Sequence, residues 1–91
     1  WSTKDRYPWL ASGIRADTHA FLAGAVRLSE CEAYRVGGTA DHVHLAVRLS
    51  RTLPVADLVK AVKTASSKWL KAQGSAYSAF HWQLGYGAFS V

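Results

Sequence analysis

The chain has 91 residues, 49% of them hydrophobic and 19% charged, which is the composition of one small globular domain and not of a disordered segment. Eleven Lys and Arg against six Asp and Glu give a formal net charge of +5, which favours a polyanionic partner, nucleic acid before a membrane surface. The single cysteine, Cys31, excludes an internal disulfide, and no apolar run is long enough to span a membrane, so we expect a cytoplasmic protein.

The first two elements predicted along the chain are a strand and a helix. Residues 1–9, WSTKDRYPW, predict the end of a strand that runs into a basic turn. A helical period follows from Trp9 to Ser29, with charged side chains away from one apolar stripe. The side chains of this stripe, which we expect to be buried, are Ile14, Phe21, Ala25 and Leu28.

A hairpin and a second helix are predicted in the middle of the chain. The stretch CEAYRVGGTADHVHLAVRL, residues 31–49, predicts two antiparallel strands with Gly37 and Gly38 at the turn. Pro54 suits the first turn of the second helix, and Gly74 suits its end. Lysines fill the face opposite its expected buried stripe, which consists of Leu58, Val62, Ala65 and Trp69.

The last predicted element is a strand in residues 80–91, FHWQLGYGAFSV, where Gly85 and Gly87 indicate a bulge or a close backbone approach. The order is therefore strand, helix, strand, strand, helix, strand, which is the ferredoxin-like split βαβ topology of the α+β class. We expect a single domain over residues 1–91, with both helices on one face of an antiparallel sheet and the other face open.

Two histidines separated by one valine mark the second strand of the hairpin, in the stretch ADHVHLAV. Successive side chains of a strand point to opposite faces, so His42 and His44 share a face and lie roughly 7 Å apart along the strand. Val43, between them, belongs to the face that we expect to contact the core. An H-x-H pair occurs in many strands without function, but on an open sheet face these imidazoles are candidate metal ligands.

Asp41, His19 and His81 are further candidate residues, and each also has an ordinary structural interpretation. Asp41 either orients one imidazole through a hydrogen bond or is a turn residue that leads into the strand. His19 lies on the polar side of its helix, where we expect it to be solvated. His81 is either a strand-edge histidine or a substitute metal ligand.

Four stretches carry a resemblance to a known family. DHVH, with the apolar strand that follows it, resembles the His-hydrophobic-His motif of the single-strand-cutting nucleases and transposases called HUH enzymes. STKDR, LVKAVKTASSKWL and WQLGYGAFSV are similar to the small one-tyrosine transposases. That group includes insertion-sequence transposases and the tyrosine transposases associated with repetitive extragenic palindromes. The resemblance covers essentially the whole chain.

The resemblance implies a reaction on DNA. Family members bind a hairpin in single-stranded DNA, and a tyrosine attacks the scissile phosphate to leave a 5′-phosphotyrosine link and a free 3′-hydroxyl. A divalent metal ion, Mg²⁺ or Mn²⁺, is held by the two histidines, here His42 and His44, which are thus the expected catalytic and metal-binding residues. Lys4, Arg6 and Lys63 match basic family positions near DNA. The family works as homodimers.

The chain departs from the family pattern at both ends. It begins where the first strand should already be under way, and it ends before the helix that carries the tyrosine and a third metal ligand. None of its four tyrosines, Tyr7, Tyr34, Tyr77 and Tyr86, occupies the family position. We therefore expect these 91 residues to bind DNA without forming a covalent adduct, and to hold a metal weakly. Two imidazoles suit Mn²⁺ better than Mg²⁺.

Two other function classes remain open. One is a non-catalytic nucleic-acid-binding module of the RNA-recognition type, which shares this topology and uses exposed aromatic side chains on its sheet. The chain lacks the K/R-G-F/Y-G/A-F-V run of such modules, and the histidine pair has no role there. The other is an H-x-H metallohydrolase, whose usual H-x-H-x-D-H pattern is replaced here by HVHLAVRL.

Overall fold

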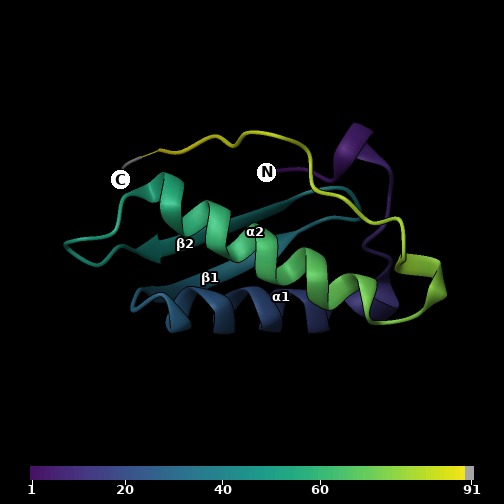
Figure 1. Ribbon diagram of the computed structural model, residues 1–91, viewed down its shortest axis with the longest axis horizontal. Helices are drawn as coiled ribbons and strands as arrows, with labels where there is room; N and C mark the ends of the chain where they lie inside the picture. The colour runs from purple at the N-terminus through teal and green to yellow at the C-terminus, as the bar shows by residue number, and fades with distance from the viewer. Residues whose placement is uncertain (90–91) are drawn as a thin grey trace.

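The computed structural model describes residues 1–89 and has the α+β architecture predicted from the sequence (Figure 1). Two long helices and one antiparallel hairpin make up its regular structure, with two short 3₁₀ turns beside them. In chain order the elements are η1 Lys4–Arg6, α1 Ser12–Leu28, β1 Glu32–Gly38, β2 Val43–Arg48, α2 Val55–Lys71 and η2 Ser75–Tyr77. Among the residues described, no helix is both long enough and apolar enough to cross a membrane.

The predicted hairpin is confirmed, with one change at its turn. β1 and β2 pair antiparallel, and the register shifts between Ala33 and Arg35, which leaves Tyr34 in a bulge. Gly37 and Gly38 are not in the turn, because they pair with His44 and Val43 as the last residues of β1. The connection is made by the residues between the two strands, so the glycines lie directly beside the histidine strand.

The first and last segments of the chain are less regular than the predicted strands. Residues 1–3 lie between β2 and the C-terminal segment, but they form only isolated bridges, Ser2 to His42 and Thr3 to Trp82. The backbone amide of Gln83 donates to the carbonyl of Ser2 at 2.9 Å, and the chain then leaves the sheet. The predicted strand in residues 80–91 is therefore wrong in extent, and its residues 90–91 lie outside the described residues. The prediction for residues 1–9 is confirmed, because the bridged Ser2 and Thr3 lead directly into the basic turn η1.

A positive φ interrupts each of these segments. Asp5 and Arg6 have φ of 56° and 54°, and Gly85 has φ of 84°, values that are incompatible with a β-strand. Strand pairing therefore stops on either side of the short bridged stretch. The complete ferredoxin-like strand order is consequently not built from regular strands, although the α+β class and the two helices are as predicted.

The helices bury slightly different faces from those predicted. In α1, Leu22 and Val26 are fully buried, whereas Leu28, predicted to be in the stripe, is 89% exposed. Thr18 is also fully buried, because its hydroxyl donates to the carbonyl of Ile14 at 2.9 Å and so leaves no unsatisfied polar group. The buried face of α1 is therefore rotated from the predicted one and includes Thr18, which a pattern of apolar residues alone does not select.

In α2, Leu58 and Val62 are buried as predicted, but the stripe continues through Ser66 and Leu70. The Ser66 hydroxyl donates to the carbonyl of Val62 at 2.6 Å and accepts the indole N–H of Trp82 at 2.9 Å. This hydrogen bond joins α2 to the C-terminal segment inside the core. The helix ends at Lys71, before Gly74.

Candidate functional site

His42, directly before β2, and His44, within it, lie on one face of the hairpin, as predicted. The His42 and His44 rings have centroids 6.2 Å apart and planes inclined by 39°. His44 is exposed and His42 is half-buried, whereas Val43 between them is 1% exposed. The side chain of Val43 therefore packs in the core, and both imidazoles point away from it.

Gly37 makes room for one of these imidazoles. A Cβ atom built on Gly37 would lie 2.7 Å from Nε2 of His44, closer than real Cβ contacts. The absence of a side chain on β1 thus lets the His44 ring lie against the neighbouring strand. In the sequence, the glycine pair before the histidines indicates this close approach, although the pair lies in β1 and not at the turn.

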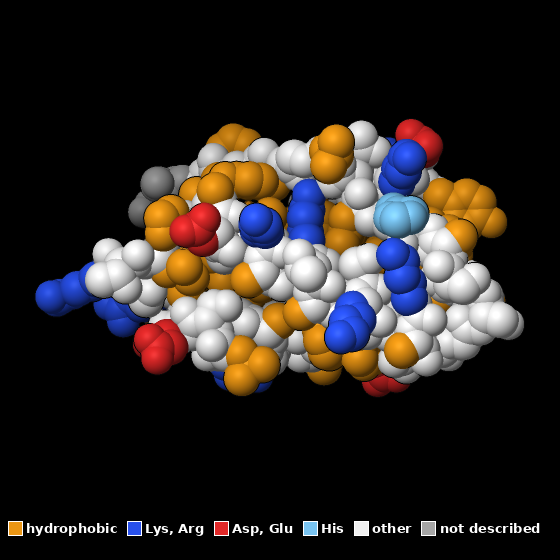
Figure 2. Space-filling view, in the orientation of Figure 1, with side chains coloured by type: hydrophobic (Ala, Val, Ile, Leu, Met, Phe, Trp, Pro, Cys, Tyr) orange, Lys and Arg blue, Asp and Glu red, His pale blue; other side chains and the backbone are white. Residues whose placement is uncertain are grey.

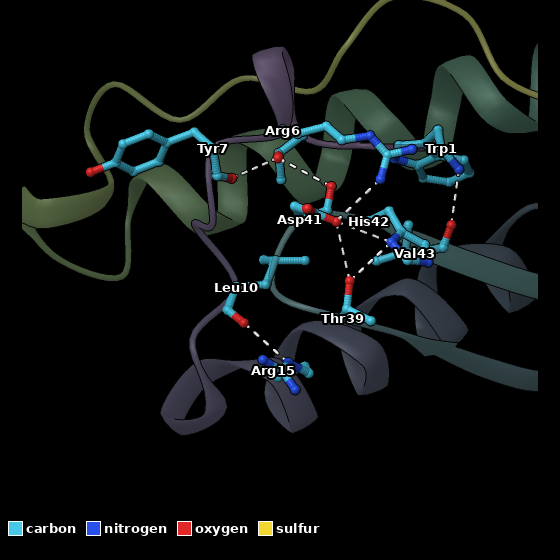
Figure 3. A network of polar contacts seen from close by, with 10 residues as sticks. Trp1, Arg6, Tyr7, Leu10, Arg15, Thr39, Asp41, His42 and Val43 are labelled. Carbon is cyan, nitrogen blue, oxygen red and sulfur yellow. Dashed lines mark hydrogen bonds and ion pairs between the residues drawn. The ribbon is translucent and has the colours of Figure 1, made fainter.

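The His42 ring is held by a polar network at the start of β2 (Figure 3). Its Nδ1 lies 3.1 Å from Oδ1 of Asp41 and 2.9 Å from the hydroxyl of Thr39. With the proton on Nδ1, the ring donates to these oxygens and keeps the lone pair of Nε2 free for a metal or a proton. The contact favours the interpretation of Asp41 as an orienting residue over that of a plain turn residue.

The neighbours of Asp41 stabilise its ionised carboxylate form. The hydrogen bond from His42 is the main reason why the pKa of the Asp41 carboxyl is lowered, with smaller contributions from Thr39 and Arg6. Arg6 Nη1 lies 3.6 Å from Oδ1 of Asp41. The carboxylate therefore lies between an imidazole and a guanidinium.

Arg6 is held in this position by a strained turn. Asp5 and Arg6 both adopt the left-handed backbone conformation, which costs about 1–3 kcal/mol at a strained non-glycine residue. The fully buried Thr3 pins the turn, since its hydroxyl lies 2.7 Å from the carbonyl oxygen of Tyr7 and 3.1 Å from that of Asp41. The backbone amide of Asp5 also donates to Oε1 of Gln83 at 3.0 Å.

A pocket of about 270 Å³ opens beside His42. It combines the N-terminal segment, the histidine strand and the C-terminal segment, and its lining residues are Trp1, Ser2, Arg6, His42, Gln83, Leu84, Gly85 and Tyr86. Sequence reasoning found no sign that a tyrosine approaches the histidines, but Tyr86 shares this pocket with His42. Tyr34 instead lies in the bulge of β1 and is 64% exposed.

Lys63 has a structural partner in addition to its expected DNA contact. Its ammonium donates to the carbonyls of Gln83 at 2.7 Å and Gly85 at 2.6 Å, and it lies 5.5 Å from the centre of the Trp1 ring. Burial lowers the pKa of this ammonium. The side chain therefore fastens the C-terminal segment to α2, and a direct DNA contact by Lys63 stays a prediction.

The other basic side chains near the site are exposed. Lys4 and Arg6 are both exposed in the turn η1, and Arg6 also lines the pocket. On the α2 face, Lys and Arg side chains are spread among uncharged and apolar ones (Figure 2). The exposed lysines of this helix are Lys60, Lys68 and Lys71. The charge is thus distributed over a broad surface, which suits an extended polyanion better than a compact anion.

The two remaining predictions about histidines have different outcomes. His19 was expected to be solvated, but it is half-buried, its Nε2 has no hydrogen-bond partner, and burial lowers its pKa. His81 is exposed and lines a second pocket of about 370 Å³ with Lys4, Asp5, Tyr7, Trp9 and Ala79. Within residues 1–89, no three or more His, Cys, Asp or Glu side chains are grouped as metal ligands, so neither histidine completes a site with the pair.

Comparison with known proteins agrees with this architecture. The sequence matches the profile of the family described as "Transposase IS200 like" over residues 1–91. A solved structure from Deinococcus radiodurans R1, described as that of a candidate transposase, is similar to this chain with a TM-score of 0.88 and 22% sequence identity. The match covers 100% of this chain and 74% of that one. No curated protein sequence matches. The family profile extends over the whole chain, and the chain therefore belongs to the IS200-like transposase family.

Proposed function

We propose that this chain recognises hairpin-containing single-stranded DNA and binds the metal ion of a DNA cleavage and joining site. The observation that supports this most directly is the His42–His44 pair on an open face, with Asp41 bracing His42 and Arg6 at the adjoining pocket. The proposed joining chemistry passes through a 5′-phosphotyrosine, as the resemblance to the one-tyrosine transposases implies. A homodimer is part of the proposal.

The donor set of the histidine pair fits a divalent metal ion in part. Neutral imidazole nitrogens are good ligands for Mn²⁺ and poorer ones for Mg²⁺, which prefers oxygen. His42 and His44 would hold the ion, with Asp41 and Thr39 fixing the tautomer of His42. A bound ion would act as a Lewis acid toward a phosphate oxygen. Arg6 adds a fixed positive charge for the DNA backbone at the same pocket.

A non-catalytic nucleic-acid-binding module is the second candidate function. Exposed aromatic side chains favour it, since Tyr34 on β1 and Tyr7 beside η1 are 64% and 60% exposed. This alternative does not explain why His42 is braced by a carboxylate. Metal binding that depends on the histidines therefore separates the two functions.

Asp41→Asn is expected to lower Mn²⁺ affinity about 10- to 100-fold, because a carboxylate that accepts from a ligating imidazole raises its basicity. The measurement is a Mn²⁺ titration followed by electron paramagnetic resonance. Asp17→Asn is the matched control, because Asp17 is exposed on α1 and the substitution makes the same change in net charge. Equal loss of affinity in both variants would mean that only the overall charge matters.

Binding to a hairpin-containing single strand is expected to exceed binding to a plain duplex of the same composition, and to weaken as salt is added. Lys4→Ala should lower the slope of log affinity against log salt by about one unit. Lys63→Ala should also weaken binding, but it frees two carbonyls of the C-terminal segment as well. Fluorescence anisotropy measures both properties.

The control for this series is Lys71→Ala, an exposed lysine at the end of α2. It should have a smaller effect than Lys4→Ala if the turn η1 lies on the DNA path. Equal affinities for hairpin and duplex would contradict hairpin recognition and favour generic binding.

A further inference from the structure

We propose that the pocket beside His42 is a single-nucleotide subsite, in which the ring of Tyr86 stacks on one unpaired base and Arg6 contacts its phosphate. The inference deepens the proposed function and rests on it, because the nucleotide belongs to a single-stranded DNA. It assigns a base-binding role to residues 83–86 of the C-terminal segment, which line the pocket.

The size of the pocket fits one nucleotide. Its volume of about 270 Å³ is just below the range of about 300–1,000 Å³ that holds drug-sized ligands, so neither a duplex nor a folded hairpin can enter it. The walls come from three parts of the chain that are distant in sequence and are brought together by the bridges of Ser2 and Thr3. An unpaired base that a flexible single strand can splay out is the smallest unit of the proposed substrate and can enter such a pocket.

Tyr86 is the aromatic side chain in this pocket with a free face. It is 41% exposed, and no aromatic pair within residues 1–89 includes it. The other ring in the lining, Trp1, is already in edge contact with Trp82 at 5.7 Å and lies beneath the ammonium of Lys63. Stacking on an aromatic ring accepts any of the four bases, because every base has a π face.

The polar groups of the pocket are suited to a nucleotide. The lining contains Arg6 and His42 and no acidic side chain, so it favours an anion. The side-chain oxygen of Gln83 accepts a hydrogen bond from the backbone amide of Asp5, which fixes the orientation of the Gln83 side-chain amide. The NH₂ group of Gln83 is then able to donate to a base carbonyl or a sugar oxygen. Base, sugar and phosphate thus each have a potential partner.

The pocket is also preformed. Lys63 holds the carbonyls of Gln83 and Gly85, and Gly85 has the positive φ of 84° that glycine adopts readily. On the opposite side, Arg6 is held by the left-handed turn and by its contact with Asp41. Binding therefore does not have to order these segments first, which lowers the entropic cost of capturing a single base.

The first experiment is a titration of ¹⁵N-labelled protein with thymidine 5′-monophosphate, thymidine or inorganic phosphate, followed by NMR. The nucleotide is expected to shift the amide signals of Arg6, His42 and residues 83–86, and phosphate to shift those of Arg6 and His42 only. Shifts of residues 83–86 that are as large with phosphate as with the nucleotide would overturn base stacking. Shifts confined to α2 or to the second pocket would overturn the location.

The second experiment uses an unstructured oligothymidylate and fluorescence anisotropy. Tyr86→Ala is expected to weaken binding about 5- to 150-fold, the effect of losing one stacked base. Tyr86→Phe keeps the ring and is expected to recover most of that loss, whereas Tyr34→Ala, at an exposed tyrosine of the β1 bulge, should change affinity less than twofold. The stacking assignment is wrong if Tyr86→Phe binds the oligothymidylate as weakly as Tyr86→Ala does. It is also wrong if Tyr34→Ala weakens binding as much as Tyr86→Ala does.

The two experiments distinguish failure of the subsite from failure of the proposed function. Nucleotide-specific shifts at Tyr86 in a protein that binds hairpin and duplex equally would support the subsite and contradict hairpin recognition. A hairpin preference that is unchanged in Tyr86→Ala, together with absent nucleotide shifts, would overturn the subsite and leave the proposed function standing.

Discussion

The double variant His42→Ala/His44→Ala is expected to lose specific Mn²⁺ binding. The two imidazoles lie 6.2 Å apart, centroid to centroid, and no cluster of three potential ligands occurs within residues 1–89. Loss of an outer hydrogen-bond partner typically lowers metal affinity about 10- to 100-fold. Removing both imidazoles should therefore lower the Mn²⁺ affinity by more than that. Calorimetric titration with Mn²⁺ measures the loss of affinity, and the double variant is expected to show nonspecific binding only.

His81→Ala is the control for this variant. His81 is exposed and lines the second pocket, so its removal should leave the Mn²⁺ affinity unchanged if the site is the His42–His44 pair. The same affinity in wild type and the double variant would end the metal proposal. Mg²⁺ should bind more weakly than Mn²⁺ to the wild type, because the pair offers nitrogen and no oxygen ligands.

Gly38→Ala is expected to destabilise the fold by about 2–4 kcal/mol in the free energy of unfolding. A Cβ atom there would lie 2.2 Å from the carbonyl oxygen of His42 and 2.9 Å from Cα of Val43, and both are backbone atoms that cannot rotate away. The residue also has φ of 149°, which side chains rarely allow. For a domain of this size the midpoint of thermal unfolding should fall by about 8 °C or more.

Gly24→Ala is the matched substitution for this prediction. Gly24 lies inside α1, and a Cβ atom there would meet nothing within 4 Å. Alanine is about 1 kcal/mol better than glycine in a helix, so Gly24→Ala should raise the unfolding midpoint. Thermal denaturation followed by circular dichroism compares the two variants. A stable Gly38→Ala protein would show that the hairpin can open without cost, and the histidine strand would not be held as described.

Local patterns predicted much of the secondary structure. The helical periods around residues 12–28 and 55–71 were found because a helix repeats its contacts every three to four residues, whatever the rest of the chain does. The hairpin and the shared face of His42 and His44 follow from the two-residue repeat of a strand. The ends of the chain were harder, because pairing there depends on partners about 40 or 80 residues away and stops where φ becomes positive.

The sequence by itself determined the α+β class, the exposed face on which the two histidines lie, and the match to the IS200-like transposase family. The tertiary structure alone decided that Lys63 holds the C-terminal segment and that Tyr86 lies in the same pocket as His42. The physical reason is the range of the interactions. Periodicity reports which way a side chain points from its own element, whereas a pocket forms where segments without periodicity are brought together by long-range hydrogen bonds.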